Sequence, residues 1–229
     1  MQHVKAICLD LDDTLWELGP VIVRAEQGVH AWFAAHYPAV TRRCTLEGMR
    51  RMRLAVEREH PGRAHDLPFL RRTTFARLAR DADYLDPGIP EAAFAEFQRL
   101  RNQLVPFTDV GPALERLAQR GPVVALTNGT ADLAAVGLRH HFAAVFMADA
   151  IGAAKPDARA FRAVCDALGF APREVLHAGD SPQHDVLGAH AAGLAAVWID
   201  RGLHAWPGGV DPPAHRVVDL GALADLVGA

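Results

Sequence analysis

The sequence predicts an α/β protein with a doubly wound, Rossmann-like parallel sheet as its core and a smaller all-α helical bundle as a cap domain. Residues 4–9 form an apolar segment that ends in an acidic cluster, and short apolar segments alternate with helical patterns from residue 105 onward. Between them, residues 17–104 show helical periodicity without a convincing strand. Because alternating strands and helices build parallel sheets, we expect a discontinuous core of residues 1–16 and 105–229, with residues 17–104 inserted as the cap.

The first apolar segment, residues 4–9, is expected to be a strand buried on both faces, as in parallel sheets. Asp10 follows it directly, at the edge where ligands bind in open α/β sheets. One of the two aspartates Asp10 and Asp12 could serve as a nucleophile or metal ligand, and the other as an acid/base. Aspartates in an ordinary turn at the end of a strand would give the same pattern. Whether these aspartates are functional therefore depends on motifs in the rest of the chain.

The inserted block is predicted to contain four helices separated by proline and glycine. Breaks fall at residues 37–38, 60–62 and 86–88. Most of its arginines are expected on solvated helix faces, whereas those at 42–43 or 71–72 suggest a second anionic group on the ligand, such as a carboxylate. The expected helices are residues 21–36, 45–60, 67–82 and 90–104.

From residue 105 the pattern becomes an alternation of helix and strand, which indicates a mostly parallel sheet. Each predicted strand is short and apolar, and each is followed by polar or glycine-rich residues. Expected strands are residues 123–126, 144–148, 175–178, 195–199 and 216–218, and expected helices are 110–120, 131–140, 160–168 and 186–192.

The composition disfavours nucleic acid and membranes as partners. The 229 residues carry a formal net charge of −3 and are 50% hydrophobic, so they provide no basic field for a polyanion. No apolar run approaches the ~20 residues that span a bilayer, and the start lacks a secretory signal. The three cysteines show neither a disulfide framework nor zinc-ligand spacing. We therefore expect a cytoplasmic protein.

Four loops after the expected strands carry residues suited to phosphate chemistry. Such loops meet at one edge of a parallel sheet, so side chains far apart in the sequence can converge there. Gly129 and the helix expected after it would add an N-terminus that suits an anion. Each loop alone is weak evidence, whereas the four in this order indicate a phosphate site. The loops contain Asp10 and Asp12, then Thr127 and Asn128, then Lys155, and finally Asp180 and Asp185.

This order of motifs resembles the haloacid dehalogenase superfamily. Its DxDxT motif corresponds to residues 10–14, its Ser or Thr after an apolar strand to Thr127, its lysine to Lys155, and its GDxxxxD motif to residues 179–185. The resemblance extends over the core and the helical insertion, which is similar to the small cap that one large subgroup carries after the first motif. None of the four motifs departs from the family pattern.

The resemblance implies hydrolysis of a phosphomonoester of a small metabolite, by a monomer or homodimer. Asp10 would be the nucleophile that becomes an aspartyl phosphate. Asp12 would protonate the leaving alkoxide and then deprotonate the attacking water. Mg²⁺, which prefers oxygen ligands, would be held by the Asp10 carboxylate, the Asp12 backbone carbonyl and Asp180.

The remaining motif residues would support this chemistry. Thr127 and the Asn128 amide would donate hydrogen bonds to phosphoryl oxygens, and Lys155 would offset the charge of nucleophile and phosphate. Asp185 would orient the metal ligands, with direct coordination left open. Thr14 would fix the turn that carries the two aspartates.

Two other functions remain open. A 2-haloacid dehalogenase of the same family would use its aspartate to displace halide from carbon, which requires neither a metal nor a proton donor, so the presence of Asp12 favours phosphate. A phospho-aspartate binding module, similar to a receiver domain, also uses an aspartate, a Thr or Ser and a lysine. Such modules are about half as long and lack a helical insertion after the first strand.

Three side chains near the motifs receive no firm role. His177 is expected to pack within its strand, and His184 to be a neighbour of the site. Trp16 suits either the wall of the pocket or packing against the cap. We also expect the cap to close over the site and exclude water during phosphoryl transfer.

Overall fold

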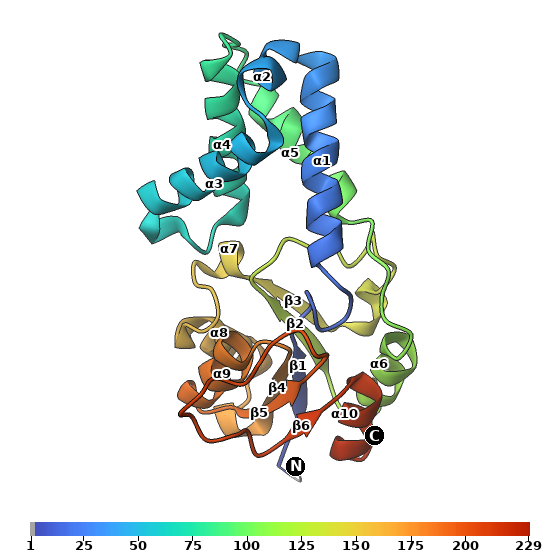
Figure 1. The fold of residues 1–229 in the computed structure, drawn as a ribbon. Helices are drawn as coiled ribbons and strands as arrows, with labels where there is room; N and C mark the ends of the chain where they lie inside the picture. Colours follow the sequence, from blue (N-terminus) through green and yellow to red (C-terminus); the bar gives the residue numbers. More distant parts are fainter. Residues whose placement is uncertain (1–2) are drawn as a thin grey trace. The chain divides into compact units, whose positions relative to one another are not determined.

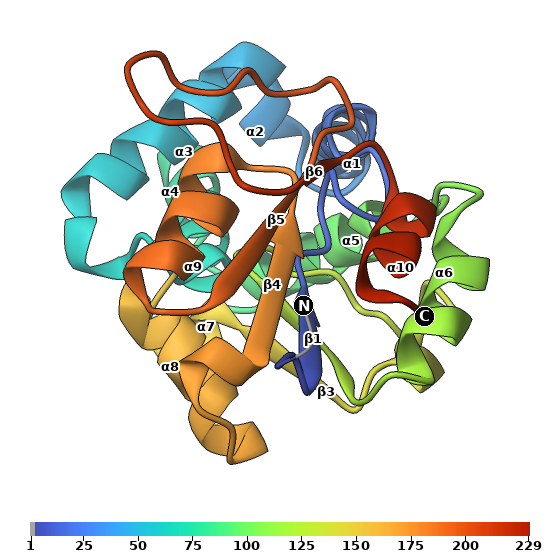
Figure 2. The same cartoon turned by 90° about the horizontal axis from the view of Figure 1, so that it is seen from below.

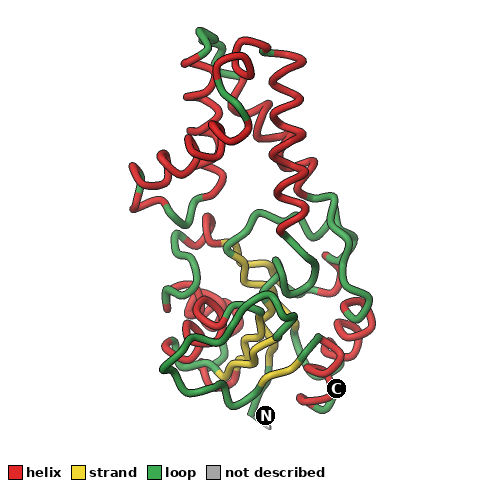
Figure 3. Tube along the Cα trace, viewed as in Figure 1, coloured by secondary structure: helices red, strands yellow, loops and turns green. Residues whose placement is uncertain are grey.

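The computed structural model describes residues 3–229, and the chain forms two compact units (Figure 1). One unit contains the described residues up to Glu17 together with Val105–Ala229, and the other is Leu18–Leu104. Every strand belongs to the first unit, while the second contains helices and loops (Figure 3). We call them the core unit and the helical unit.

The sheet of the core unit has six strands, all parallel, in the order β3-β2-β1-β4-β5-β6. The chain runs outward from β1 through β2 to β3, returns to place β4 on the other side of β1, and continues to β6. This reversal beside β1 creates a switch point, where doubly wound sheets bind ligands. The predicted fold class is confirmed. The strands are β1 (Ala6–Leu9), β2 (Val123–Thr127), β3 (Ala144–Met147), β4 (Val175–Gly179), β5 (Ala195–Ile199) and β6 (Arg216–Val217).

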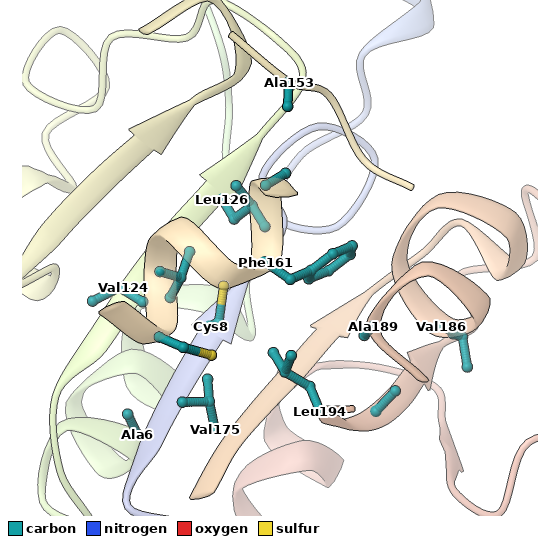
Figure 4. Packing of buried hydrophobic residues seen from close by; sticks show 14 of the residues in the cluster. Ala6, Cys8, Val124, Leu126, Ala153, Phe161, Val175, Val186, Ala189 and Leu194 are labelled. Carbon is teal, nitrogen blue, oxygen red and sulfur yellow. The ribbon is translucent and has the colours of Figure 1, made fainter. Parts of the chain in front are cut away.

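Helices cover both faces of this sheet (Figure 2). Helices α8 and α9 pack on one face and α6 and α10 on the other. On the first face, Cys8 of β1 packs with Val124 and Phe161 in a buried cluster (Figure 4). Ile7 and Leu9 are buried as well, which explains why β1 is apolar throughout rather than alternating. The helices are α6 (Val110–Ala118), α7 (Ala148–Ile151), α8 (Ala158–Leu168), α9 (Gly188–Ala191) and α10 (Leu220–Val227).

The helical unit has its own apolar core, in which Phe33, Phe75 and Phe97 from three helices are buried. Thr45 and Asp66 cap two helices, each accepting a hydrogen bond from a backbone N–H of the first turn. All four helices expected here are present, and a short α2 is additional. The elements are α1 (Gly19–His36), α2 (Pro38–Arg43), α3 (Leu46–Glu59), the 3-10 helix η1 (Pro61–Arg63), α4 (Leu67–Asp81) and α5 (Ile89–Arg101).

The prediction of a helix over residues 131–140 is wrong. One turn forms, closed by a hydrogen bond from the Val136 amide to the Asp132 carbonyl. Gly137 then adopts a left-handed φ of 80°, which ends it. The amide of Leu138 donates to the Leu133 carbonyl, and a 3-10 helix η2 (Arg139–His141) leads into β3.

Two further helices differ from expectation. The helix expected over residues 186–192 begins earlier, as a π-helix η4 (Pro182–Leu187) that continues into α9. Helix α10 was not expected, although Asp219 caps its first turn and Gly228 ends it at a φ of 73°. The 3-10 helix η3 (Pro172–Glu174) precedes β4. Within residues 3–229, no helix combines the length and apolar character needed to cross a membrane.

Candidate active site

The side chains of the first and fourth motifs meet where β1 and β4 end. Leu9 pairs with Ala125 of β2 and with Ala178 of β4, so Asp10 lies at the carboxyl edge of the central strand. The Asp10 amide donates to the Ala178 carbonyl over 3.0 Å, which extends the pairing by one residue. Asp10 and Asp180 therefore emerge from adjacent strands, as the parallel topology predicts.

Lys155 binds two of these carboxylates at once. Its Nζ lies 2.5 Å from Oδ1 of Asp10 and 2.6 Å from Oδ1 of Asp185. All three side chains are buried, with at most 9% of any side chain exposed. The sequence has 22 arginines but only two lysines, Lys5 and Lys155. Lys155 is thus a buried cation that joins the first, third and fourth motifs.

Asp185 accepts hydrogen bonds from three groups, which is more than a helix cap needs. Besides Lys155, His177 Nε2 donates to its Oδ1 over 2.9 Å and the Ser181 amide to its Oδ2 over 2.9 Å. His177 does pack in its strand, edge-on to Phe161 with ring centroids 5.2 Å apart. It also belongs to the site, which the expectation of strand packing alone missed.

Thr14 connects the two acidic motifs directly. Its Oγ1 lies 3.2 Å from Oδ2 of Asp10 and 3.1 Å from Oδ1 of Asp180, and it accepts a hydrogen bond from the Asp180 amide at 3.0 Å. The hydroxyl is fully buried. Thr14 therefore does more than shape its own turn, because it fixes the distance between residues 10 and 180.

Asp12 is oriented by Trp16. The indole Nε1 donates to Asp12 Oδ1 over 2.8 Å, and the indole itself has no exposed surface. Trp16 is buried, and its polar atom reaches a motif residue. A buried indole N–H needs such a partner.

The second motif is joined to the third through Asn128. Its side-chain Nδ2 donates to the Lys155 carbonyl (2.9 Å) and its Oδ1 accepts from the Lys155 amide (2.8 Å). This paired contact holds the backbone of the lysine loop, so the side chain of Asn128 is engaged there. Thr127 is buried at the end of β2, where its Oγ1 accepts from the Gly129 amide at 2.9 Å.

The cluster carries more negative than positive charge. Burial raises the pKa of Asp10 well above its ordinary value, and Asp185 and Asp180 add to this while Lys155 opposes it. Burial and Asp185 raise the pKa of Asp180 to about 6. Burial would also raise the pKa of Asp185, but Lys155 and His177 outweigh it and hold that pKa low. Because three carboxylates face one ammonium group, the cluster has an excess of negative charge that a cation would neutralise.

The donor set suits a hard divalent cation. Carboxylate oxygens of Asp10, Asp180 and Asp185 lie within 4.8 Å of one another, and a second group joins Asp180 with Asp13 and His204. Carboxylate oxygens are ligands that Mg²⁺ prefers. Because Asp185 is engaged by Lys155, His177 and an amide, Asp10 and Asp180 are the carboxylates best placed to bind a cation.

Two residues in the loop after β5 contact the acidic motifs, and the sequence did not predict these contacts. His204 Nε2 lies 3.0 Å from Oδ2 of Asp180. Arg201 donates through Nε and Nη2 to the Thr14 carbonyl (3.1 and 3.0 Å) and forms two hydrogen bonds to Asp109. The rule that ligands bind at the carboxyl ends of parallel strands applies to β5 as well. The polar residues that follow Ile199 could therefore have indicated that this loop belongs to the site.

The structure thus brings Asp10, Thr14, Lys155, Asp180 and Asp185 into one hydrogen-bonded cluster. Asn128 is joined to it through the Lys155 backbone, and Asp12 is bonded to Trp16. Thr127 stands on the neighbouring strand at the same edge. The backbone amide of His184 donates to Ser181 Oγ, and its side chain is exposed.

Comparisons with known proteins found a matching family model and several relatives. The family model of haloacid dehalogenase-like hydrolases matches residues 4–193. A phosphoserine phosphatase of Thermus thermophilus is 39% identical over 159 residues, which cover 66% of this chain. The match covers 62% of the phosphatase, so this chain spans less than two thirds of that relative's length. The 5-amino-6-(5-phospho-D-ribitylamino)uracil phosphatase of Escherichia coli is 32% identical over 201 residues, covering 86% of this chain and 84% of that protein.

A solved structure shows similarity over nearly the whole chain. The crystal structure of a 2-haloacid dehalogenase from Pseudomonas syringae pv. tomato superimposes with a TM-score of 0.91 at 30% identity, covering 98% of both chains. A phosphatase from Thermococcus onnurineus has the same fold, with a TM-score of 0.70 at 24% identity over 98% of both chains.

Proposed function

The chain belongs to the haloacid dehalogenase-like hydrolase family, and we propose that it is a magnesium-dependent phosphomonoesterase that works through an aspartyl phosphate on Asp10. The phosphatases among its relatives support hydrolysis of phosphorylated metabolites. The observation that carries the proposal is the buried cluster in which Lys155 joins Asp10 to Asp185 and Thr14 joins Asp10 to Asp180.

In this proposal Asp10 attacks phosphorus and forms an acyl phosphate as the bond to the ester oxygen breaks. Asp12, in its acid form, gives its proton to the departing alkoxide. The Asp12 carboxylate then takes a proton from a water that attacks the phosphorus of the acyl phosphate. Inorganic phosphate leaves, and the carboxylate of Asp10 is restored.

The remaining residues neutralise charge and position the phosphate. Lys155 offsets the negative charge of Asp10, because a carboxylate otherwise repels a phosphate dianion. We assign the Thr127 hydroxyl and the backbone amide of Asn128 to the phosphoryl oxygens, since the side chain of Asn128 is engaged with Lys155. Asp185 acts through Lys155, which it holds in place.

Mg²⁺ would be held by the carboxylates of Asp10 and Asp180 and by the Asp12 backbone carbonyl. When bound, it supplies positive charge that lets an anionic nucleophile approach an anionic phosphate. The excess of carboxylates in the cluster supports this assignment, as do the raised pKa values of Asp10 and Asp180, which burial and the neighbouring carboxylates cause.

Dehalogenation of a 2-haloacid is the second candidate, because the structure that superimposes with a TM-score of 0.91 is described as a 2-haloacid dehalogenase. Displacing halide from carbon requires no proton donor and no metal. Asp12, oriented by Trp16, and the acidic set around Asp180 would then have no function. These residues favour phosphate as the substrate group.

The test is hydrolysis of p-nitrophenyl phosphate by the wild type, with Mg²⁺ and with EDTA, and by Asp10→Asn and Asp12→Asn. We expect metal-dependent turnover, no reaction in Asp10→Asn, and in Asp12→Asn a stoichiometric burst of nitrophenolate followed by slow turnover. Nitrophenolate leaves without a proton, so only the second step needs Asp12. Asp166→Asn, at an exposed aspartate of α8, should behave as wild type.

Turnover in EDTA, or full activity in Asp10→Asn, would exclude the phosphatase. Chloride release from 2-chloropropionate that persists in EDTA and in Asp12→Asn would establish the dehalogenase instead. A panel of phosphorylated metabolites, including phosphoserine and phosphoglycolate because relatives bear those names, then identifies the substrate.

A further inference from the structure

The helical unit contains a pocket that is lined by none of the residues assigned to the proposed hydrolysis. It lies among α1, α3, α4 and α5 and is open to solvent on one side. Met49, Phe75 and Phe97 provide apolar walls, and arginines and one glutamate line the rest. Pockets with apolar walls and a few polar groups are typical small-molecule sites.

Arg71 is the distinctive group in this pocket. Its guanidinium stacks on Phe97, with Cζ 3.6 Å from the ring centroid, and only 17% of the side chain is exposed. Its one ion pair within residues 3–229 is a loose contact of 4.0 Å with Glu26, and its N–H groups make no hydrogen bond in that part of the chain. Stacking fixes the plane of the guanidinium while leaving its donors for a ligand.

Among the residues that line the pocket, Arg71 is the arginine without a close carboxylate partner. The charged lining residues are Glu26, Arg50, Arg53 and Arg71. Glu26 is held by Arg50 at 2.7 Å, and Arg53 by Glu57 at 3.0 Å, so both arginines already have partners. Burial, reinforced by the charge of Arg53, lowers the pKa of Arg71 to about 10, so the group is still a cation at neutral pH.

We propose that this pocket binds a small molecule through a carboxylate paired with Arg71 and an apolar part against Met49 and Phe75. A planar guanidinium matches a carboxylate in a two-point contact. A monoanion fits better than a phosphate dianion, because Glu26 lies 4.0 Å from Arg71 and repels each added negative charge. The site lies wholly within Leu18–Leu104, and none of the residues assigned to the proposed hydrolysis lines it.

Titration calorimetry on the full-length protein tests this with 3-phenylpropionate and its neutral amide, 3-phenylpropionamide. We expect the wild type to bind the acid about tenfold to a hundredfold more tightly than the amide, the range for a charged hydrogen-bonded contact. Arg71→Met, which keeps an apolar side chain on Phe97, should lose that difference. Arg72→Met is the matched control, since Arg72 pairs with Glu91 and does not line the pocket.

Equal binding of acid and amide by the wild type would overturn the proposal without requiring any variant. Undiminished acid binding by a folded Arg71→Met protein would do the same, as would inorganic phosphate binding more tightly than the acid in a way that depends on Arg71. No step of the measurement uses a phosphate ester, so failure of the phosphatase would leave these results unchanged.

Discussion

The indole Nε1 of Trp16 donates a 2.8 Å hydrogen bond to Oδ1 of Asp12. Because Trp16 has no exposed surface, its indole cannot swing away, and the carboxylate it holds has a fixed orientation. The proposed acid/base is thereby positioned by a residue four places later in the same loop. Proton transfer depends on such positioning, since the donor must be within reach of the leaving oxygen.

Trp16→Phe should therefore slow the proposed phosphatase. The phenyl ring fills most of the same space and cannot donate, so we expect kcat to fall about tenfold to a hundredfold with a smaller change in KM, as for loss of a charged hydrogen bond. Trp206→Phe removes a different indole donor, which binds the Val210 carbonyl, and should leave both constants unchanged. A rise in KM with kcat unchanged in Trp16→Phe would contradict this role.

Lys155→Met should both destabilise the fold and abolish activity. The change leaves Asp10 and Asp185 buried without their cation, and breaking a buried pair costs about 3–5 kcal/mol. Lys5→Met is the natural comparison, because Lys5 is 59% exposed in its pair with Glu174 and such pairs contribute about 1 kcal/mol or less. Urea denaturation of the two variants measures the difference, and equal losses would refute it.

Magnesium should stabilise the protein through Asp180. At a hundredfold excess over Kd a ligand contributes about 2.7 kcal/mol, or a rise in Tm of roughly 5–10 °C for a chain of this size. In Asp180→Asn this rise should vanish. Because the pKa of Asp180 is raised to about 6, its ionised form costs stability at neutral pH, so metal-free Asp180→Asn should melt above the metal-free wild type. Thermal denaturation with Mg²⁺ and with EDTA tests both statements.

Gly179→Ala should disrupt the site by steric overlap. A Cβ at this position would lie 2.4 Å from Cγ of Asp185 and 2.9 Å from Cβ of Asp10. Overpacking of this kind typically costs about 1–3 kcal/mol, and here it displaces both carboxylates, so activity should fall much more than stability. Gly208→Ala meets nothing within 4 Å and serves as the control. Crystals of Gly179→Ala with Asp10 and Asp185 unmoved would disprove the explanation.

The contact between Asp109 and Arg201 should make stability depend on acid pH. Burial raises the pKa of Asp109, but the Arg201 hydrogen bonds and the Leu220 amide outweigh it and lower the net pKa. A lowered pKa means that the contribution is complete above the unfolded value of about 4 and disappears as the pH falls through the folded value. The stability difference between wild type and Asp109→Asn should be constant from pH 7 to about 4 and shrink below it. Urea titrations across that range measure it, and a difference that grows in acid would contradict the sign.

Local patterns in the sequence determined the fold class and the motif positions. An apolar run followed by an acidic cluster marks the end of β1 without any knowledge of its neighbours, and the alternation after residue 105 specifies a parallel sheet. Once the sheet is parallel, its loops must meet at one edge. The convergence of Asp10, Lys155 and Asp180 was therefore predictable from positions alone.

Only the tertiary structure decided which atoms meet. Thr14 and Asp180 are 166 residues apart, and Thr14 and Arg201 are 187 apart, so no local pattern specifies their contacts. The same applies to His204 on Asp180 and to Arg71 stacked on Phe97 from a neighbouring helix. Side-chain hydrogen bonds need partners placed to within a fraction of an ångström, and that precision comes from packing, which periodicity in the sequence does not encode.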